Sequence, residues 1–416
     1  MTASPAHDRR SLQAVVKALR FHRSSTDELA AIPEDLWPAL LDELDREHLT
    51  LALGARCADP LPPLARARVE RNLRDNAARH DRLVAAHREI NDALAGRAVE
   101  YVVLKGLSQW PYYCEEPRQR PQYDIDLYVP DESMSGAIAA LRGLGYQTAG
   151  VTEDPGADHL PVMIRKTGWT WGHNYYDPEM PFSLELHFRF WNPRRMGFET
   201  AGTAQFWTRR IACRAAGIEF PALDTVDGLT YSALHLVRHF LGGDLKLRHV
   251  YEMAHFLQRS VEDHAFWARW SEAGLRSCRV MEGIAFRLAR DWFQCALHPA
   301  ASAAVEDLPA GARRWFALFG SAPASLGGPN KNEIWLHFCL LESRRERLSM
   351  AARRLFPTRR SRVVRDAHLP ATHVGLPLRL RRVGYEASFL AGRAAHHLRA
   401  FAPTLRGAYL WCSGKR

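Results

Sequence analysis

The chain has few cysteines, no long apolar run and no leader-like N-terminus, and each absence excludes a class of protein. No stretch approaches the roughly 18 consecutive apolar residues that a membrane helix requires, so we expect no transmembrane segment. The N-terminal sequence MTASPAHDRRSLQAVV has charged residues where a signal peptide would have its apolar segment. The seven cysteines are scattered, and no two form a C-x-x-C pair, which excludes a zinc ribbon and a secreted disulfide framework. A cytoplasmic protein is therefore expected.

Loops that mark several enzyme classes are also missing. The sequence has no Walker loop, no G-x-S-x-G elbow and no G-x-G-x-x-G fingerprint. It does have the composition of a globular protein, with 47% hydrophobic and 25% charged residues, and this excludes a disordered or collagenous chain. Its 416 residues are enough for two or three folding units with a buried core.

Positive charge is concentrated at the C-terminal end of the sequence. The chain has a formal net charge of +10, but residues 344–416 contain 17 Lys or Arg against 3 Asp or Glu, a net charge of +14 that leaves −4 for the rest. Aromatic residues lie among the arginines of this segment. We therefore predict that residues 344–416 contact a polyanion, either nucleic acid or an anionic membrane. The alternative is that these arginines only cover solvated helices.

The apolar pattern predicts helical regions on either side of one β-rich region, and hence an α+β fold. Residues 1–95 read as an N-terminal helical region, because apolar residues recur there at spacings of three and four. Residues 96–224 contain short β-branched and alternating runs, which are typical of a small mixed β-sheet. Helical spacing returns over residues 225–330, which we expect to pack on this core. Residues 331–416 form the basic, Arg-rich C-terminal helical region.

The same spacing predicts individual elements. Strands are expected over residues 99–104, 123–129, 160–166, 172–176 and 183–190. Helices are expected over residues 107–113, 133–144, 229–241, 248–258, 279–296 and 332–348. Asp131 is a plausible N-cap for the second of these helices, and the Gly-Gly-Pro sequence at 327–329 predicts a turn.

The sequence YDIDLYV at residues 123–129 places two carboxylates on one side of a strand. Because side chains two residues apart in a strand share a face, Asp124 and Asp126 project together, while Ile125 and Leu127 turn toward the core. Neighbouring carboxylates repel each other unless a cation lies between them, and oxygen ligands suit Mg²⁺. The pattern therefore indicates a divalent-metal site, with a solvated strand face as the alternative explanation.

Two neighbouring segments favour the metal site. Upstream, a strand ends in Lys105-Gly106 at the start of a short helix, an arrangement that offers an ammonium and backbone N–H groups to a phosphate. Downstream, SLELHFRF places Glu185 and His187 on one strand face. A third carboxylate on a neighbouring strand would complete a site for two Mg²⁺ ions. We expect His187 either to position an acceptor or to make a structural hydrogen bond.

Three runs of the sequence, taken in order, resemble a known family. They are VVLKGLSQWPYY…RQRPQYDIDLYV, then SLELHFRF, then LTYSALHLVRHFLGGDLKLRHVYEMAHFL. Together they are similar to the bacterial uncharacterised nucleotidyltransferase family, which belongs to the polymerase-β-type nucleotidyltransferase superfamily. The resemblance covers roughly residues 94–257, and it implies that residues 96–224 form a nucleotidyltransferase core.

The resemblance also implies two sets of site residues and a reaction. The catalytic, metal-holding residues would be Asp124, Asp126 and Glu185. The nucleotide-binding residues would be Lys105, Gly106, Ser108 and Arg120, the last of these contacting the triphosphate. The implied reaction is the Mg²⁺-dependent transfer of a nucleoside monophosphate from an NTP to an unidentified acceptor (a small molecule, a sugar, an RNA or a protein) with release of pyrophosphate. The alternative is a silent nucleotidyltransferase fold that binds nucleic acid or an anionic membrane through its basic C-terminal region.

Two further groups of side chains each admit two explanations. His235 and His239 lie four residues apart on one helix face, which is the spacing of a zinc site but also of packed, hydrogen-bonded histidines. Arg238, Lys246 and Arg248 either close over a nucleotide from the helical side or cover a solvated helix face.

Overall fold

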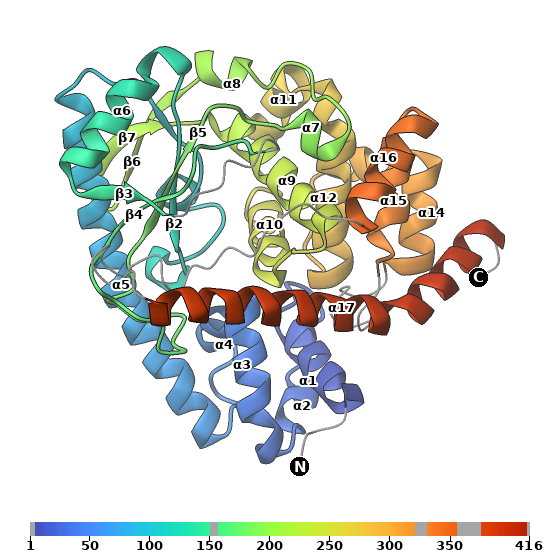
Figure 1. The fold of residues 1–416 in the computed structure, drawn as a ribbon. Helices are drawn as coiled ribbons and strands as arrows, with labels where there is room; N and C mark the ends of the chain where they lie inside the picture. The colour runs from blue at the N-terminus through green and yellow to red at the C-terminus, as the bar shows by residue number, and fades with distance from the viewer. Residues whose placement is uncertain (1–4, 150–156, 321–330, 356–375, 414–416) are drawn as a thin grey trace.

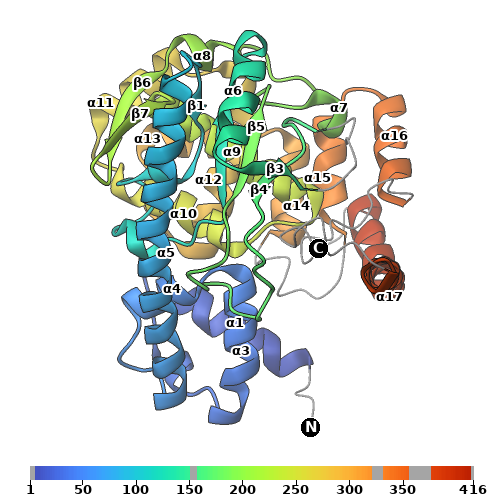
Figure 2. The same cartoon turned by 60° about the vertical axis from the view of Figure 1, so that its left-hand side comes forward.

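A seven-stranded mixed sheet lies among helices in the computed structural model of the chain (Figures 1 and 2). The structure describes residues 5–149, 157–320, 331–355 and 376–413. Sheet and helices together confirm the predicted α+β class. None of the helices in the described ranges has an apolar stretch long enough to cross a bilayer.

The strands come from the central part of the chain and pair in the order β3-β4-β5-β2-β1-β7-β6. They are β1 (Val102–Val103), β2 (Asp124–Tyr128), β3 (Tyr146–Thr148), β4 (Met163–Arg165), β5 (Ser183–His187), β6 (Ile211–Ala215) and β7 (Ile218–Ala222). Short helices connect them: 3₁₀ turns η2 (Gly106–Gln109) and η3 (Pro117–Gln119), and α-helices α6 (Asp131–Gly143), α7 (Pro193–Met196) and α8 (Gln205–Thr208).

Further helices flank the sheet in the sequence. Those before it are α1 (Pro5–Ala18), α2 (Asp27–Ala30), η1 (Glu34–Leu36), α3 (Trp37–Glu47), α4 (Thr50–Arg56) and α5 (Pro63–Ala95). Those after it are α9 (Thr225–Gly242), α10 (Leu247–Arg259), α11 (His264–Ala273), η4 (Arg276–Cys278), α12 (Arg279–Phe293), α13 (Pro299–Glu306), α14 (Ala310–Phe319), α15 (Glu333–Leu340), α16 (Arg344–Leu355) and α17 (Leu376–Ser413).

The two faces of the sheet pack against different helices. Ile125 and Leu184 lie in an apolar cluster with side chains of α5 and α6, on one side of the sheet in Figure 1. On the other face, Val102 packs in a cluster that includes Tyr231 of α9. Because side chains alternate along a strand, the acidic residues of β2 and β5 project toward the α9 side.

The helices that cover this second face share one large apolar core with the N-terminal helices. That core includes Val15 of α1, Leu41 of α3, Val250 of α10 and Ile284 of α12. It fixes α9 and α10 opposite the sheet. At the start of α9, the Asp224 carboxylate accepts a hydrogen bond from the backbone N–H of Val226 at 2.9 Å, the usual way to satisfy a free helix N-terminus.

Two predictions in the β-rich region are wrong. Residues 172–176 are not a strand; the Asn174 side chain accepts a hydrogen bond from the backbone N–H of Tyr176 at 2.9 Å, and such a turn replaces a strand ladder. Asp131 is not the cap of α6 but its first residue, after the extended Pro130, where its charge complements the helix dipole.

Helices are shorter than predicted in two places. The helix expected over residues 107–113 is only the 3₁₀ turn η2, and Pro111 follows it closely. The helix expected over residues 332–348 is two helices. The Ser343 hydroxyl accepts the backbone N–H of Glu346 at 3.1 Å, and the Glu346 carboxylate accepts that of Ser343 at 2.9 Å. This reciprocal capping starts a new helix. The turn predicted at 327–329 lies outside the described residues.

Candidate active site

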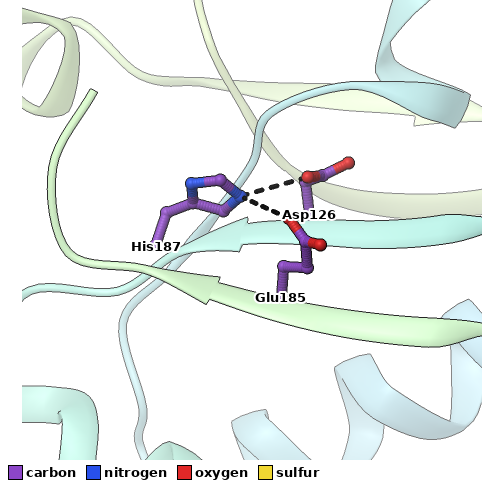
Figure 3. A group of neighbouring side chains, drawn as sticks. All are labelled: Asp126, Glu185 and His187. Carbon is purple, nitrogen blue, oxygen red and sulfur yellow. Dashed lines mark hydrogen bonds and ion pairs between the residues drawn. The ribbon is translucent and has the colours of Figure 1, made fainter. Parts of the chain in front are cut away.

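Three titratable side chains meet where β2 and β5 run side by side (Figure 3). The two strands are parallel, and Asp126 lies opposite Glu185 in their register. One ligand atom from each of Asp126, Glu185 and His187 lies within 4.8 Å of the others. The side chains of Asp126 and His187 are only 1% exposed, and that of Glu185 is 17% exposed. Thus the structure brings together two of the three predicted carboxylates and adds an imidazole.

Basic groups surround both carboxylates of this cluster. His187 Nε2 lies 3.1 Å from Asp126 Oδ1 and 3.6 Å from Glu185 Oε2. Lys105 Nζ, at the end of the neighbouring strand, lies 3.1 Å from Asp126 Oδ2. His159 Nε2 lies 3.6 Å from Glu185 Oε2. The buried negative charge is therefore locally compensated, as burial of ionised groups requires.

The pKa values of the cluster follow from these contacts. Burial alone would raise the pKa of Asp126, but the Lys105 ammonium and the His187 hydrogen bond hold it below its ordinary value. The pKa of Glu185 is also low, because His187 and His159 outweigh the effect of burial. Burial would lower the pKa of His187, yet its bonds to Asp126 and Glu185 raise it to about 9. At neutral pH both carboxylates are charged and His187 is protonated.

Asp124 differs from the other two carboxylates because it has no basic partner in direct contact. Within the described ranges, no hydrogen bond or ion pair involves its carboxylate, which is partly exposed and lines a cavity. Burial and the neighbouring charge of Asp126 raise the pKa of Asp124 to about 6, although Lys105 acts in the opposite direction. Asp124 is thus a carboxylate on the cavity wall whose charge is not neutralised.

The cavity beside Asp124 lies between the sheet and helices α9 and α10 and has a volume of about 160 Å³. Many of its lining side chains are basic or contain imidazole: Lys105, Arg120, His235, His239, Arg248 and His249. The charged lining residues are Lys105, Arg120 and Arg248 against Asp124 and Glu252, and this excess of positive charge favours an anionic ligand.

Arg120 reaches the cavity wall but is held there by a buried ion pair. Its Nε lies 2.9 Å from Glu252 Oε1, and its Nη2 donates to Gln109 Oε1 at 2.7 Å. Arg248 shares the same carboxylate, with its Nε 3.6 Å from Glu252 Oε1. Glu252 therefore positions two guanidinium groups at the cavity, of which the sequence predicted one as a triphosphate contact.

The predicted phosphate loop lies at the cavity only in part. Lys105 and Gly106 line the cavity, but Ser108 is not among the lining residues. Gly106 has φ +76°, and a Cβ there would lie 2.2 Å from the Gln122 side chain, so no other residue fits without displacing that side chain. The Gly106 N–H donates to Gln109 Oε1 at 3.1 Å, so this donor is already used within the protein.

Three histidines cluster on the helical side of the cavity. His235 Nε2 lies 3.1 Å from Lys105 Nζ and 3.2 Å from His239 Nε2. The His249 ring centroid lies 5.2 Å from that of His235 and 5.4 Å from that of His239. Burial lowers the pKa of all three, so they are neutral at pH 7. Among the described residues, the group suited to a metal ion is Asp126, Glu185 and His187, and the geometry favours hydrogen-bonded histidines over a zinc site.

Only one of the three basic residues predicted to close over a nucleotide lines the cavity. That residue is Arg248. Arg238 is partly buried and forms an ion pair with Asp158, which helps to lower the pKa of that carboxyl to about 2 despite the burial of Asp158. Lys246 lies 4.0 Å from Glu47 and is 39% exposed. His249 was missed by the sequence reasoning, although it directly follows Arg248 on the same helix.

Comparison with known proteins identifies one family. The sequence model of the uncharacterised nucleotidyltransferase family matches residues 33–294. The match covers more than half of the chain and includes all seven strands of the described sheet and the helices that line the cavity. No curated protein and no solved structure matches the chain.

Proposed function

The chain belongs to the uncharacterised nucleotidyltransferase family, and from that premise we propose that it transfers a nucleoside monophosphate from an NTP to an acceptor, with release of pyrophosphate. The observation that supports this most is the group of Asp126, Glu185 and His187, which could hold a metal ion, with Asp124, two residues before Asp126 on β2, lining the neighbouring cavity. In this proposal, residues 96–224 are a polymerase-β-type catalytic core, residues 225–330 cover its open face, and the reaction takes place in the cytoplasm.

The donor set fits a divalent cation. Carboxylate oxygens are the ligands that Mg²⁺ prefers. Burial and the charge of Asp126 raise the pKa of Asp124 to about 6, so a bound cation would stabilise its charged form. Asp124, Asp126 and Glu185 would hold the metal, in a site for two Mg²⁺ ions. When bound, Mg²⁺ would neutralise charge on the triphosphate and assist ionisation of the acceptor.

Basic side chains on the cavity wall would hold the triphosphate. Lys105 lies between Asp126 and His235, with contacts of 3.1 Å to each, and its ammonium would supply positive charge to a phosphate group. Arg120 and Arg248, positioned by Glu252, would contact the phosphates farther along the cavity. Such preorganised cations stabilise the charge that develops during phosphoryl transfer.

Asp124 is the carboxylate most open to a bound cation, because no hydrogen bond or ion pair within the described ranges involves its side chain. Its pKa of about 6 in the metal-free protein leaves it deprotonated, and able to bind Mg²⁺, at pH 7. Asp126 and Glu185, which form ion pairs with basic residues, would share the metal with it.

The proposal is tested by pyrophosphate release from the full-length protein. Each of the four NTPs is incubated with Mg²⁺ and a cell extract as a source of acceptors, and the extract alone serves as the blank. We expect release with at least one NTP and its loss in Asp124→Asn. The matched control is Asp59→Asn, at an exposed aspartate remote from the sheet in sequence. Equal release by the wild type and Asp124→Asn would refute the assignment.

A further inference from the structure

Helix α17 has a stripe of large apolar side chains that the other described residues leave uncovered. Seven of them are between 55% and 78% exposed: Leu380, Val383, Leu390, Leu398, Phe401, Leu405 and Tyr409. At 3.6 residues per turn, these positions fall within an arc of about 100° around the helix axis. A continuous apolar stripe of this length is uncommon on a protein surface and marks a binding face.

Over residues 400–411, the opposite side of α17 holds the helix against the protein. Ala400 is buried, and the backbone at Gly407 passes so close to Asn332 that a Cβ there would lie 2.1 Å from the amide oxygen. The ring of Trp411 stacks on Trp335 with a centroid distance of 6.4 Å. Figure 2 views α17 almost along its axis at the edge of the molecule. The apolar stripe therefore faces away from the protein.

Exposed arginines lie beside this stripe. The sequence from Leu376 to Ser413 contains six arginines and one glutamate. At 100° per residue, Arg399 and Arg406 lie on one flank of the stripe, whereas Arg393 lies at the same angle as Trp411, on the side that contacts the protein. In the part of the chain that the structure describes, none of these three forms an ion pair with a carboxylate. The face thus combines apolar area with unneutralised positive charge.

We propose that α17 lies in the surface of an anionic lipid bilayer, with the stripe among the acyl chains and the arginines at the lipid headgroups. A helix with an apolar face and basic flanks binds a membrane in this way. The helix does not cross the bilayer, because its apolar residues occupy one face and no window along it is apolar enough. The inference does not depend on nucleotidyl transfer.

Two other occupants fit the same surface less well. A second copy of the chain would bring two arginine-rich helices together with a single glutamate on each, so like charges would oppose the pairing. A nucleic acid would pair with the arginines but would leave leucine and valine side chains in water, because aliphatic groups do not provide the flat stacking surface of aromatic rings.

Vesicle flotation with the full-length protein tests the proposal. Vesicles of phosphatidylcholine alone are compared with vesicles that contain equal parts of phosphatidylcholine and phosphatidylglycerol, at low and moderate salt. We expect binding to the anionic vesicles that weakens as salt rises. The double variant Leu398→Glu/Leu405→Glu should bind at least about tenfold more weakly. Leu64→Glu, at a leucine of α5 that is 56% exposed, is the matched control and should bind as the wild type does.

A second variant separates the contribution of charge. Arg399→Gln/Arg406→Gln should weaken binding to anionic vesicles by about fivefold for each arginine removed, which corresponds to the contribution of about 1 kcal/mol that a basic residue makes near an anionic surface. Because these side chains and the two leucines are exposed, the variants should melt at the wild-type temperature, and a melting curve checks this directly.

Four results would overturn the proposal. These are the absence of flotation with anionic vesicles at low salt, equal binding by the leucine variant and the wild type, tighter binding to single-stranded RNA or duplex DNA than to vesicles, and a dimer in sedimentation that the leucine variant dissociates. The last two would assign the face to a nucleic acid or to a second copy of the chain.

Discussion

Replacement of Asp124 by Asn should stabilise the protein and abolish its response to Mg²⁺. Burial and Asp126 raise the pKa of the Asp124 carboxyl from 3.8 to about 6, so the folded state disfavours its charged form. At about 1.36 kcal/mol per pKa unit, the charge costs about 3 kcal/mol at pH 8. We reduce this to about 2 kcal/mol, because the side chain remains partly accessible to solvent.

The pH dependence of this effect has a defined sign. A carboxyl whose pKa is raised on folding does not reduce the free energy of unfolding below its unfolded pKa of 3.8, because it is protonated there in both the folded and the unfolded state. The cost grows as pH rises from about 4 to 6 and is constant above that range. Asparagine resembles the neutral form, so Asp124→Asn should stabilise the protein fully at pH 8 and by less than half as much at about pH 4.5.

Thermal unfolding with and without millimolar Mg²⁺ measures both effects. The wild type should gain stability from the ion through mass action, whereas Asp124→Asn should gain little. Asp59→Asn, at an exposed site, should match the wild type in every condition. An Asp124→Asn protein that melts below the wild type at pH 8, or that gains as much as the wild type from Mg²⁺, would refute the reasoning.

Three further variants test other parts of the account. Glu185→Gln should lower single-turnover transfer by about 100-fold while NTP affinity in calorimetry changes little, because the basic wall holds the phosphates; lost affinity with normal turnover at saturation would contradict this. Asp158→Asn should lower the free energy of unfolding by about 2 kcal/mol above pH 4, because the ionised Asp158 carboxylate stabilises the folded state there. This stabilisation is lost as the pH falls from 3.8 toward 2. In denaturant unfolding, the difference between the variant and the wild type should therefore be smaller at pH 3 than at pH 7. Glu252→Gln should cost about 3–5 kcal/mol in denaturant unfolding, because it leaves Arg120 buried without a carboxylate, and a cost below about 1 kcal/mol would exclude a structural ion pair.

The strand pattern predicted that the acidic residues lie on strand faces, but it did not predict which side chains they contact. The period-2 alternation of YDIDLYV and SLELHFRF placed Asp126 and Glu185 on strand faces, and both segments are strands. The parallel pairing of β2 with β5, however, brings His187 into contact with Asp126, which is 61 positions away in the sequence. No local pattern specifies such a pairing, because it is set by packing of the whole sheet.

Several site features were outside the reach of sequence reasoning for the same reason. The Lys105 ammonium contacts His235, which is 130 residues away, and the Arg120–Glu252 pair joins residues 132 apart. Residues 172–176 contain aromatic side chains that favour a strand, but a local Asn174 turn prevails. The strands β6 and β7 were not predicted. They are joined by a tight turn at Gly217, which has φ +72°, and the sequence analysis did not identify that turn.

The most direct test of the central proposal compares two positions of the label in the nucleotide. The full-length protein is incubated with Mg²⁺, a cell extract and NTP labelled either at the α-phosphate or at the γ-phosphate, and acceptors are separated from free nucleotide. Nucleotidyl transfer predicts label on an acceptor only from the α-position, with none in the Asp124→Asn reaction. Transfer of label from the γ-position, or no labelled acceptor with any of the four NTPs, would contradict the proposal.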